Sequence, residues 1–533
     1  RSCGDQMSEH ASQRIQETKH SVFQRIAWVL THRLFFDVLF ILLQIGVLAA
    51  MVLVFSNYFV YFYAACIVLT FAAVIWIIAS RNHPDYKIAW IVPIMTVPVF
   101  GGLLYLLFGG NRLSQRSRNR LRKLEELQRQ AMGDGSQVTD ILPSGDVSAK
   151  VQSRYITKAS LYPPHAHTQT TYYPLGEDLF AGMLEELEQA EHYIFLQYFI
   201  IQEGEMWDAI LEILERKAAA GLDVRVLYDD IGCLFTLPKH YARTLREKGI
   251  ACKVFNPFRP VVSLRLNNRD HRKICVIDGH TAFTGGVNLS DEYINRVVRF
   301  GHWKDSGIRV KGEAAWNLTV MFLSSWGVTE EGEEEFSRYR PSTYLEEELP
   351  TDGLVQPFMD SPLDDEAVSA TIYLNLITRA NRYIYITTPY LIIDHAMTDA
   401  LCTAAKSGVD VRLITPHIPD KRRIFELTRA HYGPLVQAGV KVYEYLPGFI
   451  HSKTCVVDDQ FGMVGTINLD YRSLYLHFEC GVWLYQSRSV ETIRDDFLAT
   501  QAMSQQVQLA EIQQLSWGKR LYRSLLRVFA PLL

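Results

Sequence analysis

The distribution of hydrophobic positions divides the chain into an apolar N-terminal region and a longer region in which apolar and polar positions alternate. Three apolar stretches cover residues 34–55, 58–79 and 88–108, and only the first contains a charged residue, Asp37. A helix of about 20 apolar residues spans a hydrocarbon core of about 30 Å. Each stretch is long enough to cross a membrane, and this length favours membrane helices over buried core helices.

Basic residues beside the apolar stretches indicate their orientation. A basic run without acidic residues follows the third stretch, so the positive-inside rule places the rest of the chain in the cytoplasm. We therefore expect a multi-pass protein of the cell membrane with three crossings. Pro93 and Pro98 leave two crossings and a re-entrant third segment open as the alternative. The basic run, which also suits anionic lipid head groups, consists of Arg112, Arg116, Arg118, Arg120, Arg122 and Lys123.

The remainder of the chain has an α/β pattern that occurs twice. From about residue 170, short β-branched and aromatic runs alternate with helical periodicity. A duplicated unit predicts two similar lobes that face each other across a pseudo-two-fold axis, although two independent domains would leave the same repeat. Residues 190–196, 221–227 and 249–255 resemble, in the same order, residues 380–386, 408–414 and 439–445.

These patterns predict six parts of the chain. They are an N-terminal tail (1–33), a membrane region (34–108), a basic linker (109–150), a first lobe (151–345), a second lobe (355–505) and an amphipathic C-terminal tail (506–533). In the last part, Trp517, Leu521, Leu525 and Val528 recur at helical spacing beside Lys519, Arg520, Arg523 and Arg527. This pattern predicts an interfacial helix on a membrane surface, with a helix packed on the second lobe as the alternative.

One motif occurs in both halves at equivalent places. Its spacing is H-x-K-x4-D, followed after six residues by G-x-x-N. A single copy would indicate a solvated strand face and a turn aspartate. Two copies at equivalent positions of a repeat predict a catalytic site. The motif residues are His271, Lys273 and Asp278, then His451, Lys453 and Asp458, and the downstream positions include Gly286, Asn288, Thr466 and Asn468.

The motif residues suit chemistry on a phosphodiester. Residues i and i+2 of a strand share a face, so each His is expected beside its Lys. Two facing lobes would then combine two imidazoles, two ammonium groups and two amides in one pocket. The Lys and Asn side chains can stabilise the charge of the transition state, while one imidazole attacks phosphorus and the other protonates the departing oxygen. This scheme requires no metal or cofactor. Asp278 and Asp458 lie on the opposite strand face, and we expect them to brace backbone.

Composition excludes several other classes of protein. The 54 Lys and Arg residues nearly balance the 58 Asp and Glu residues, which excludes a basic nucleic-acid coat and an acidic disordered chain. The eight cysteines are scattered without a C-x-x-C pair, which fits a reducing compartment and neither a disulfide scaffold nor a zinc site. Cys275 and Cys455 share one motif position, and we interpret them as strand-core residues rather than a redox pair.

The duplicated motif resembles the signature of the phospholipase D superfamily, and within it the chain is similar to bacterial cardiolipin synthases. The resemblance runs from about residue 88 to the C-terminus, and the motif tails 285–293 and 465–473 are close to those of the family. It implies two phospholipase D-like lobes, each a mixed sheet flanked by helices, behind an α-helical membrane region. The matching residues of that region are Trp90, Pro98, Gly101, Tyr105 and Gly109.

The resemblance also implies a reaction. Two phosphatidylglycerol molecules would give cardiolipin and glycerol through a phosphatidyl-histidine intermediate, with His271 as nucleophile and His451 as general acid and then base. Asp305 and Glu479 match the acidic residues that orient the imidazoles in the family. The chain departs from the family pattern at three positions: Gly286 and Thr466 replace a common Ser, and His477 replaces a common Asn.

Three other functions share parts of this pattern. A hydrolytic phospholipase D would use the same site with water as acceptor and release phosphatidic acid. A nuclease of the superfamily conflicts with the apolar stretches and with a net charge of -4. A non-catalytic membrane scaffold conflicts with the retention of both His-Lys pairs. We therefore expect phosphatidylglycerol, other anionic phospholipids and the membrane as partners, and no nucleic acid, while the oligomeric state stays open.

Overall fold

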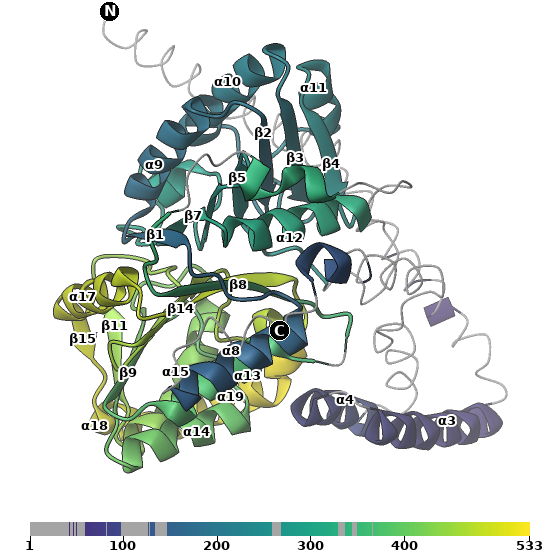
Figure 1. Ribbon diagram of the computed structural model, residues 1–533. Helices are drawn as coiled ribbons and strands as arrows, with labels where there is room; N and C mark the ends of the chain where they lie inside the picture. The colour runs from purple at the N-terminus through teal and green to yellow at the C-terminus, as the bar shows by residue number, and fades with distance from the viewer. Residues whose placement is uncertain are drawn as a thin grey trace, which may run out of the picture. The chain divides into compact units, whose positions relative to one another are not determined.

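The computed structural model describes most of the chain beyond residue 146 and parts of the region before it (Figure 1). The chain divides into two compact units, Arg1–Ser80 with Trp90–Asn111 and Phe258–Leu264, and Arg81–Ala89 with Arg112–Pro257 and Arg265–Leu533. Each unit is described by itself. The described residues are 42, 46, 49–50, 59–80, 83–96, 126, 128–133, 146–257, 268–328, 336–343, 349–364 and 366–532.

Two helices occupy the described part of the N-terminal region. Helix α3, Phe59–Ala79, lies on the second apolar stretch, and α4, Pro84–Thr96, contains the start of the third. Helix α4 continues through Pro93, whereas Pro98 lies outside the described residues. Among the described residues, no helix has both the length and the hydropathy needed to cross a membrane. The first predicted span, apart from four positions, and the third span beyond Thr96 lie outside the described residues.

The first lobe contains a seven-stranded mixed sheet with the order β1-β7-β6-β5-β2-β3-β4. Strands β2, β3 and β4 are parallel, and the other neighbours are antiparallel. Its strands are β1 (Thr168–Tyr173), β2 (Tyr193–Tyr198), β3 (Asp223–Asp229), β4 (Ala251–Phe255), β5 (Ile274–Ile277), β6 (Thr281–Gly285) and β7 (Gly307–Gly312); its helices are α9 (Gly176–Glu188), α10 (Glu205–Ala219), α11 (Tyr241–Glu247) and α12 (Ala315–Val328).

The second lobe repeats this order as β8-β14-β13-β12-β9-β10-β11 and adds β15 at the far edge. Its strands are β8 (Leu354–Asp360), β9 (Tyr383–Thr387), β10 (Asp410–Pro416), β11 (Lys441–Tyr445), β12 (Thr454–Val457), β13 (Phe461–Gly465), β14 (Glu479–Tyr485) and β15 (Ser504–Gln506). Its helices are α13 (Val368–Arg379), α14 (His395–Lys406), α15 (Arg422–Gln437), α16 (Tyr471–Tyr475), α17 (Arg488–Ala502), α18 (Leu509–Gln513) and α19 (Trp517–Phe529). Helix α8, Val147–Ser160, packs on α13 and β8. The chain thus has the α/β fold with two mixed sheets flanked by helices.

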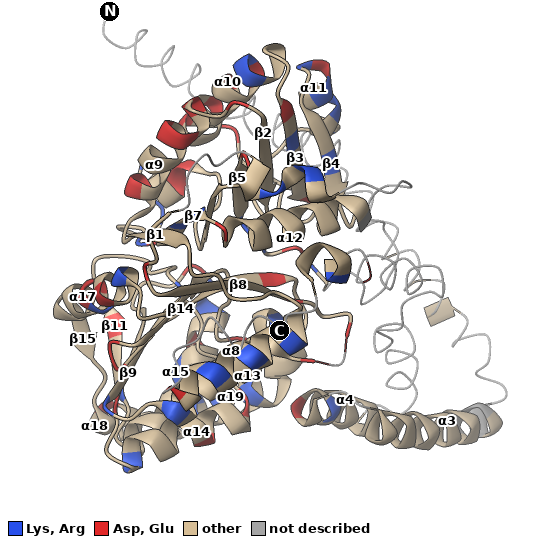
Figure 2. Ribbon diagram, viewed as in Figure 1, with Lys and Arg blue, Asp and Glu red and all other residues tan. Residues whose placement is uncertain are grey.

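Burial follows from this layered arrangement. The parallel strand β2 is buried along its whole length because helices cover both faces of its sheet. Charged side chains lie mainly on outer helices such as the acid-rich α9, and the strands contain few of them (Figure 2). Cys275 and Cys455 are fully buried in β5 and β12, as expected for core residues.

The two lobes share a hydrophobic core. Helix α12 of the first lobe packs against β8 of the second, and α17 of the second packs against β1 of the first. One buried cluster includes Phe195 and Trp316 of the first lobe together with Tyr385 and Phe497 of the second. Polar contacts continue the interface, since the hydroxyl of Tyr172 donates to Asp496 over 2.7 Å. This shared core excludes the alternative of two independent domains.

Each motif aspartate organises a turn. Asp278 follows β5 with a φ of 50°, and Asp458 follows β12 with a φ of 56°. The carboxylate of Asp278 accepts hydrogen bonds from the backbone N–H groups of residues 191, 192 and 193, each over 2.8 Å. Asp458 accepts three equivalent bonds from residues 381, 382 and 383. Each carboxylate therefore ties a motif strand to the start of the neighbouring strand.

We expect Asp278→Asn to destabilise the fold without removing the chemistry. Asn tolerates a positive φ, but its amide group places a donor against backbone N–H groups, so the free energy of unfolding should fall by about 1–3 kcal/mol. Thermal unfolding of the detergent-purified protein measures this loss. The control is Asp178→Asn at an exposed position on α9, which should change stability by no more than about 0.5 kcal/mol. Equal melting temperatures for the two variants would contradict the bracing role.

Candidate active site

The motif His and Lys residues lie just before their strands. The prediction that they lie on the strands is wrong, because β5 begins at Ile274 and β12 at Thr454. The physical reason is that the backbone of each motif His pairs with the opposite lobe instead of with its own sheet. The N–H of His271 donates to the carbonyl of Phe478 in the other lobe over 3.0 Å, and the N–H of His451 donates to the carbonyl of Lys304 over 2.7 Å. Each motif thus crosses from its own sheet to the opposite lobe.

Each imidazole is paired with a carboxylate of the opposite lobe. Nδ1 of His271 lies 2.9 Å from Oε1 of Glu479, at the start of β14. Nδ1 of His451 lies 2.6 Å from Oδ2 of Asp305, just before β7. Both carboxylate side chains are completely buried, and the imidazoles are about nine-tenths buried. Each motif imidazole therefore has its carboxylate partner in the opposite lobe.

The two pairs differ in their protonation. Burial raises the pKa of Asp305 to about 7, against the opposing charges of Lys453 and Lys273. Burial would also raise the pKa of Glu479, but His271 and His477 outweigh this effect and hold the pKa well below its usual range. Burial lowers the pKa of His271 to about 3 and that of His451 well below its usual range. The Glu479 pair therefore contains an ionised carboxylate and a neutral imidazole, whereas the Asp305 pair holds an additional proton near neutral pH.

The motif lysines add positive charge to the same site. Burial lowers the pKa of Lys273 to about 8 and that of Lys453 to about 7. Each ammonium group donates to the carbonyl of its own motif His, and both interact electrostatically with Asp305 and Glu479. An ammonium group has three donors, so further donors remain for phosphate oxygens.

Residues of the motif tails support the carboxylates differently in the two lobes. The Thr466 hydroxyl donates to Oε2 of Glu479. Gly286 is the equivalent position in the first lobe, where an added Cβ would lie 2.0 Å from Oδ1 of Asp305. The shorter acid thus occupies the space that a side chain fills in the other lobe. This lack of space gives a physical reason for Gly286, which replaces the Ser that is common in the family.

The two motif asparagines have different hydrogen-bond surroundings. Asn288 accepts from the N–H of Ile200 over 3.0 Å and donates to the hydroxyl of Tyr293 over 2.7 Å. The Tyr293 ring lies 5.6 Å from the ring of His451, so Asn288 supports an aromatic wall of the site. The amide oxygen of Asn468 is buried and has no hydrogen-bond partner among the described residues. The structure places Asp278 and Asp458 in turns, where backbone amides occupy their carboxylates.

Aromatic residues that the sequence reasoning missed surround both imidazoles. Trp303 and Phe449 lie 5.5 and 5.9 Å from the ring of His451, and Phe199 lies 5.1 Å from that of His271. Their sequence signal is weak, although Trp303 lies only two residues before Asp305. These rings exclude water from the imidazoles and lower the local dielectric constant.

One group of side chains has the composition of a metal site. His271, His477 and Glu479 each place a possible ligand atom within 4.8 Å of the others. Neither ring nitrogen of His477 has a hydrogen-bond partner among the described residues, although Nδ1 lies 3.8 Å from Oε1 of Glu479. A metal bound to Nδ1 of His271 would displace the hydrogen bond that this nitrogen donates to Glu479 and that orients the ring. The donor set therefore fits an ion only at the expense of the imidazole–carboxylate pair.

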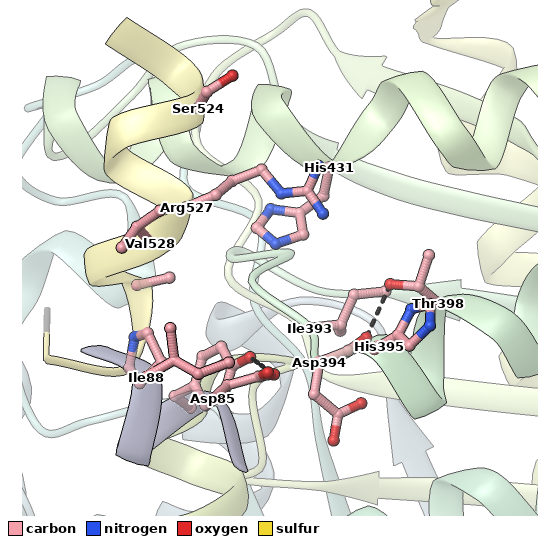
Figure 3. Close-up of a pocket in the computed structure, with 13 residues that line it drawn as sticks. Asp85, Ile88, Ile393, Asp394, His395, Thr398, His431, Ser524, Arg527 and Val528 are labelled. Atoms are coloured by element: carbon pink, nitrogen blue, oxygen red, sulfur yellow. Dashed lines mark hydrogen bonds between the residues drawn. The ribbon is translucent and has the colours of Figure 1, made fainter. Parts of the chain in front are cut away.

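A separate cavity lies in the second lobe, away from the motifs. It has a volume of about 400 Å³, and its lining includes Asp394, His431 and Arg527 (Figure 3). None of the motif residues lines it. It therefore does not correspond to the imidazole site.

Comparisons with known proteins agree with this geometry. Residues 183–299 and 373–500 match the family model described as cardiolipin synthase, PLD-like domain, and residues 68–110 match the phospholipase D-nuclease N-terminal model. The chain is 35% identical to a cardiolipin synthase of Halalkalibacterium halodurans over 86% of this chain and 91% of that protein. It is also 35% identical to a cardiolipin synthase of Geobacillus kaustophilus over 88% of this chain and 93% of that protein.

A solved structure shows the same fold. The crystal structure of phosphatidylserine synthase from Haemophilus influenzae has a TM-score of 0.52 and 15% identity, and it covers 72% of this chain and 98% of that one. The family match and the related cardiolipin synthases identify a phosphatidyltransferase of the phospholipase D superfamily. The chain belongs to the cardiolipin synthase family of that superfamily.

We expect the difference between Gly286 and Thr466 to be functional. In Gly286→Thr the new side chain displaces the Asp305 carboxylate, and kcat/KM should fall at least about 100-fold because His451 loses its orienting partner. The double variant Gly286→Thr/Asp305→Glu reproduces the pair found in the second lobe and should regain at least about tenfold. Thr466→Ser, which retains the hydroxyl, is the control and should stay within a few-fold of wild type. A double variant no better than the single one would disprove the steric explanation.

The protonation states give a pH dependence of kcat/KM. Burial brings the pKa of Asp305 and of Lys453 to about 7 and that of Lys273 to about 8, and we expect all three to act in their protonated forms. Because their protons are present below these values and lost above them, kcat/KM should decline from about pH 7 upward. The low pKa of His271 and of Glu479 should leave little acid inhibition down to about pH 5. A rate constant that rises between pH 7 and pH 9 would contradict this assignment.

Chelation tests whether the His271–His477–Glu479 group holds a required metal. We expect full activity after dialysis against EDTA, because proton transfer and nucleophilic attack use only the described side chains. His477→Asn should likewise keep kcat/KM within a few-fold, since the ring nitrogens of His477 hold no hydrogen bond in the described structure. A loss on chelation that added metal restores would show that the group is a metal centre.

Proposed function

We propose that this protein condenses two phosphatidylglycerol molecules into cardiolipin and glycerol. The single observation that supports this most directly is the crossed arrangement, in which each lobe supplies the carboxylate that orients the other lobe's imidazole. Transfer of a phosphatidyl group needs a nucleophile and a proton donor on opposite sides of one phosphorus atom. Cardiolipin synthases among the relatives add support for this acceptor chemistry.

In the first step, Nε2 of His271 attacks the phosphorus of one phosphatidylglycerol. Glu479 holds the Nδ1–H of this neutral imidazole, which leaves the lone pair on Nε2. The phosphorus–oxygen bond to glycerol breaks, and the His451–Asp305 pair donates its additional proton to the departing oxygen. Free glycerol leaves, and a phosphatidyl-histidine remains. The raised pKa of Asp305 and the lowered pKa of Glu479 support His271, rather than His451, as the nucleophile.

In the second step, the glycerol hydroxyl of another phosphatidylglycerol is the acceptor. The His451–Asp305 pair, which has lost its proton, removes the proton of this hydroxyl, and the oxygen attacks phosphorus. The phosphorus–nitrogen bond breaks, cardiolipin forms, and His271 returns to its neutral state. Lys273 and Lys453 stabilise the negative charge on the non-bridging oxygens in both steps. The aromatic walls around the imidazoles favour a lipid alcohol over water as acceptor.

We further propose that the enzyme is a multi-pass protein of the cell membrane with both lobes on the cytoplasmic side. The apolar stretches of the sequence, the match of residues 68–110 to the family's N-terminal model and the lipid substrates support this location. The proposed lobes are residues 151–345 and 355–505, preceded by the membrane region 34–108 and the basic linker 109–150. Other anionic phospholipids are proposed as additional ligands.

Product analysis with pure phosphatidylglycerol tests the reaction. We expect cardiolipin and glycerol in equal amounts from the wild-type protein, and a loss of turnover of at least about 100-fold in His271→Ala and in His451→Ala. With radiolabelled phosphatidylglycerol, acid-labile label should be trapped on the wild-type protein after rapid denaturation and be absent in His271→Ala. Phosphatidic acid as the main product would identify a hydrolase instead. Label retained by His271→Ala would disprove the assignment of the nucleophile.

A further inference from the structure

The C-terminal helix α19 has an unusually complete separation of apolar and basic residues. Trp517, Leu521, Leu525 and Val528 are spaced so that they share one face of the helix. Lys519, Arg520, Arg523 and Arg527 follow the opposite side. A helix of this kind normally packs its apolar face on the protein and leaves its charged face in water.

In this protein the orientation is reversed. Arg523 is buried, and its guanidinium group contacts Glu426 of α15 over 2.8 Å. Lys519 lies 3.3 Å from the same carboxylate. On the other face, the exposed fractions are 78% for Trp517, 44% for Leu521, 51% for Leu525 and 37% for Val528. The ion pairs, together with Leu526 packed against the cluster that contains Leu427, hold the helix on the second lobe with the face of Trp517 and Leu525 outward.

The charges around this apolar face favour a membrane as its occupant. Arg520 and Arg527 are exposed along its border, and an interfacial helix has this combination of apolar residues, a terminal Trp and flanking cations. Anionic head groups complement these cations, whereas a second copy of the same helix would bring like charges together. Of the two sequence alternatives, the structure shows the helix packed on the second lobe, and its apolar residues Trp517, Leu521, Leu525 and Val528 stay exposed.

The cavity at the end of α19 extends this surface. Arg527 and Val528 line one side of the cavity, and Ile88 of α4, with an exposed fraction of 52%, lines another (Figure 3). The Arg527 guanidinium points into the cavity toward His431 in this view (Figure 3).

We propose that α19 docks the catalytic lobes onto an anionic lipid surface through this outward apolar face. The docking goes beyond the proposed reaction, because it needs neither imidazole and does not depend on which alcohol accepts the phosphatidyl group. It brings the second lobe to the bilayer independently of the N-terminal apolar stretches.

Quenching of Trp517 fluorescence by brominated lipid tests the proposal in the full-length protein. The protein is reconstituted in nanodiscs that contain phosphatidylglycerol and brominated phosphatidylcholine, and the signal of Trp517 is obtained as the difference from Trp517→Phe. We expect the Trp517 signal to fall by more than half. Leu521→Glu/Leu525→Glu should abolish this loss, because it places two charges on an exposed face that does not support the fold. The control Gln513→Glu/Gln514→Glu adds the same charge nearby and should retain the quenching.

The possible results separate docking from catalysis and from self-association. His271→Ala should be quenched like wild type, so a failure of the reaction leaves the docking test intact. An unquenched Trp517 in the wild-type protein, or unchanged quenching in Leu521→Glu/Leu525→Glu, would overturn the proposal. In detergent, a particle mass of Leu521→Glu/Leu525→Glu that is half the mass of the wild-type particle would also overturn it. The apolar face would then join two copies of the chain.

Discussion

The reciprocal hydrogen bonds between imidazoles and carboxylates are the constraint on which the rest of the structure depends. His271 relies on Glu479 of the second lobe, and His451 relies on Asp305 of the first. A buried carboxyl group without a hydrogen-bond partner is strongly unfavourable, so each lobe contains an acid whose partner the other lobe must supply. The arrangement ties assembly of the site to assembly of the lobes, and neither half of the duplicated chain can hold the reactive geometry alone.

The shared core maintains this geometry. Helices α12 and α17 each pack on a strand of the opposite lobe, and the extended segments before β5 and β12 pair with the opposite lobe rather than with their own sheets. The lobes are therefore held at the interface from which the imidazoles emerge. Small differences between the two lobes then give the two imidazole–carboxylate pairs different properties. The pairs Gly286–Asp305 and Thr466–Glu479 occupy equivalent places but differ in length and hydrogen bonding, and they hold their protons differently.

The fold class and the motif residues could be predicted from the sequence, because the duplication repeats the same residue spacing in both halves of the chain. The repeated strands gave the α/β class, and the repeated H-x-K spacing identified His271 and His451. The crossing of the pairs could not be predicted, because spacing along the chain contains no information about which lobe supplies a carboxylate. The strand positions of Lys273 and Lys453 were predicted wrongly for the same reason, since their segments pair across the interface. The orientation of α19 could not be predicted either, because a helical pattern does not show which face of the helix packs on the protein.

The most direct test of the shared site is a structure of the protein with orthovanadate, which adopts the five-coordinate geometry of phosphoryl transfer. The account requires a single vanadate between the lobes, with Nε2 of His271 bonded to vanadium and Nε2 of His451 within about 2.7–3.2 Å of the opposite apical oxygen. Both ammonium groups should contact its equatorial oxygens. Two vanadates bound separately, one at each imidazole, would contradict the account.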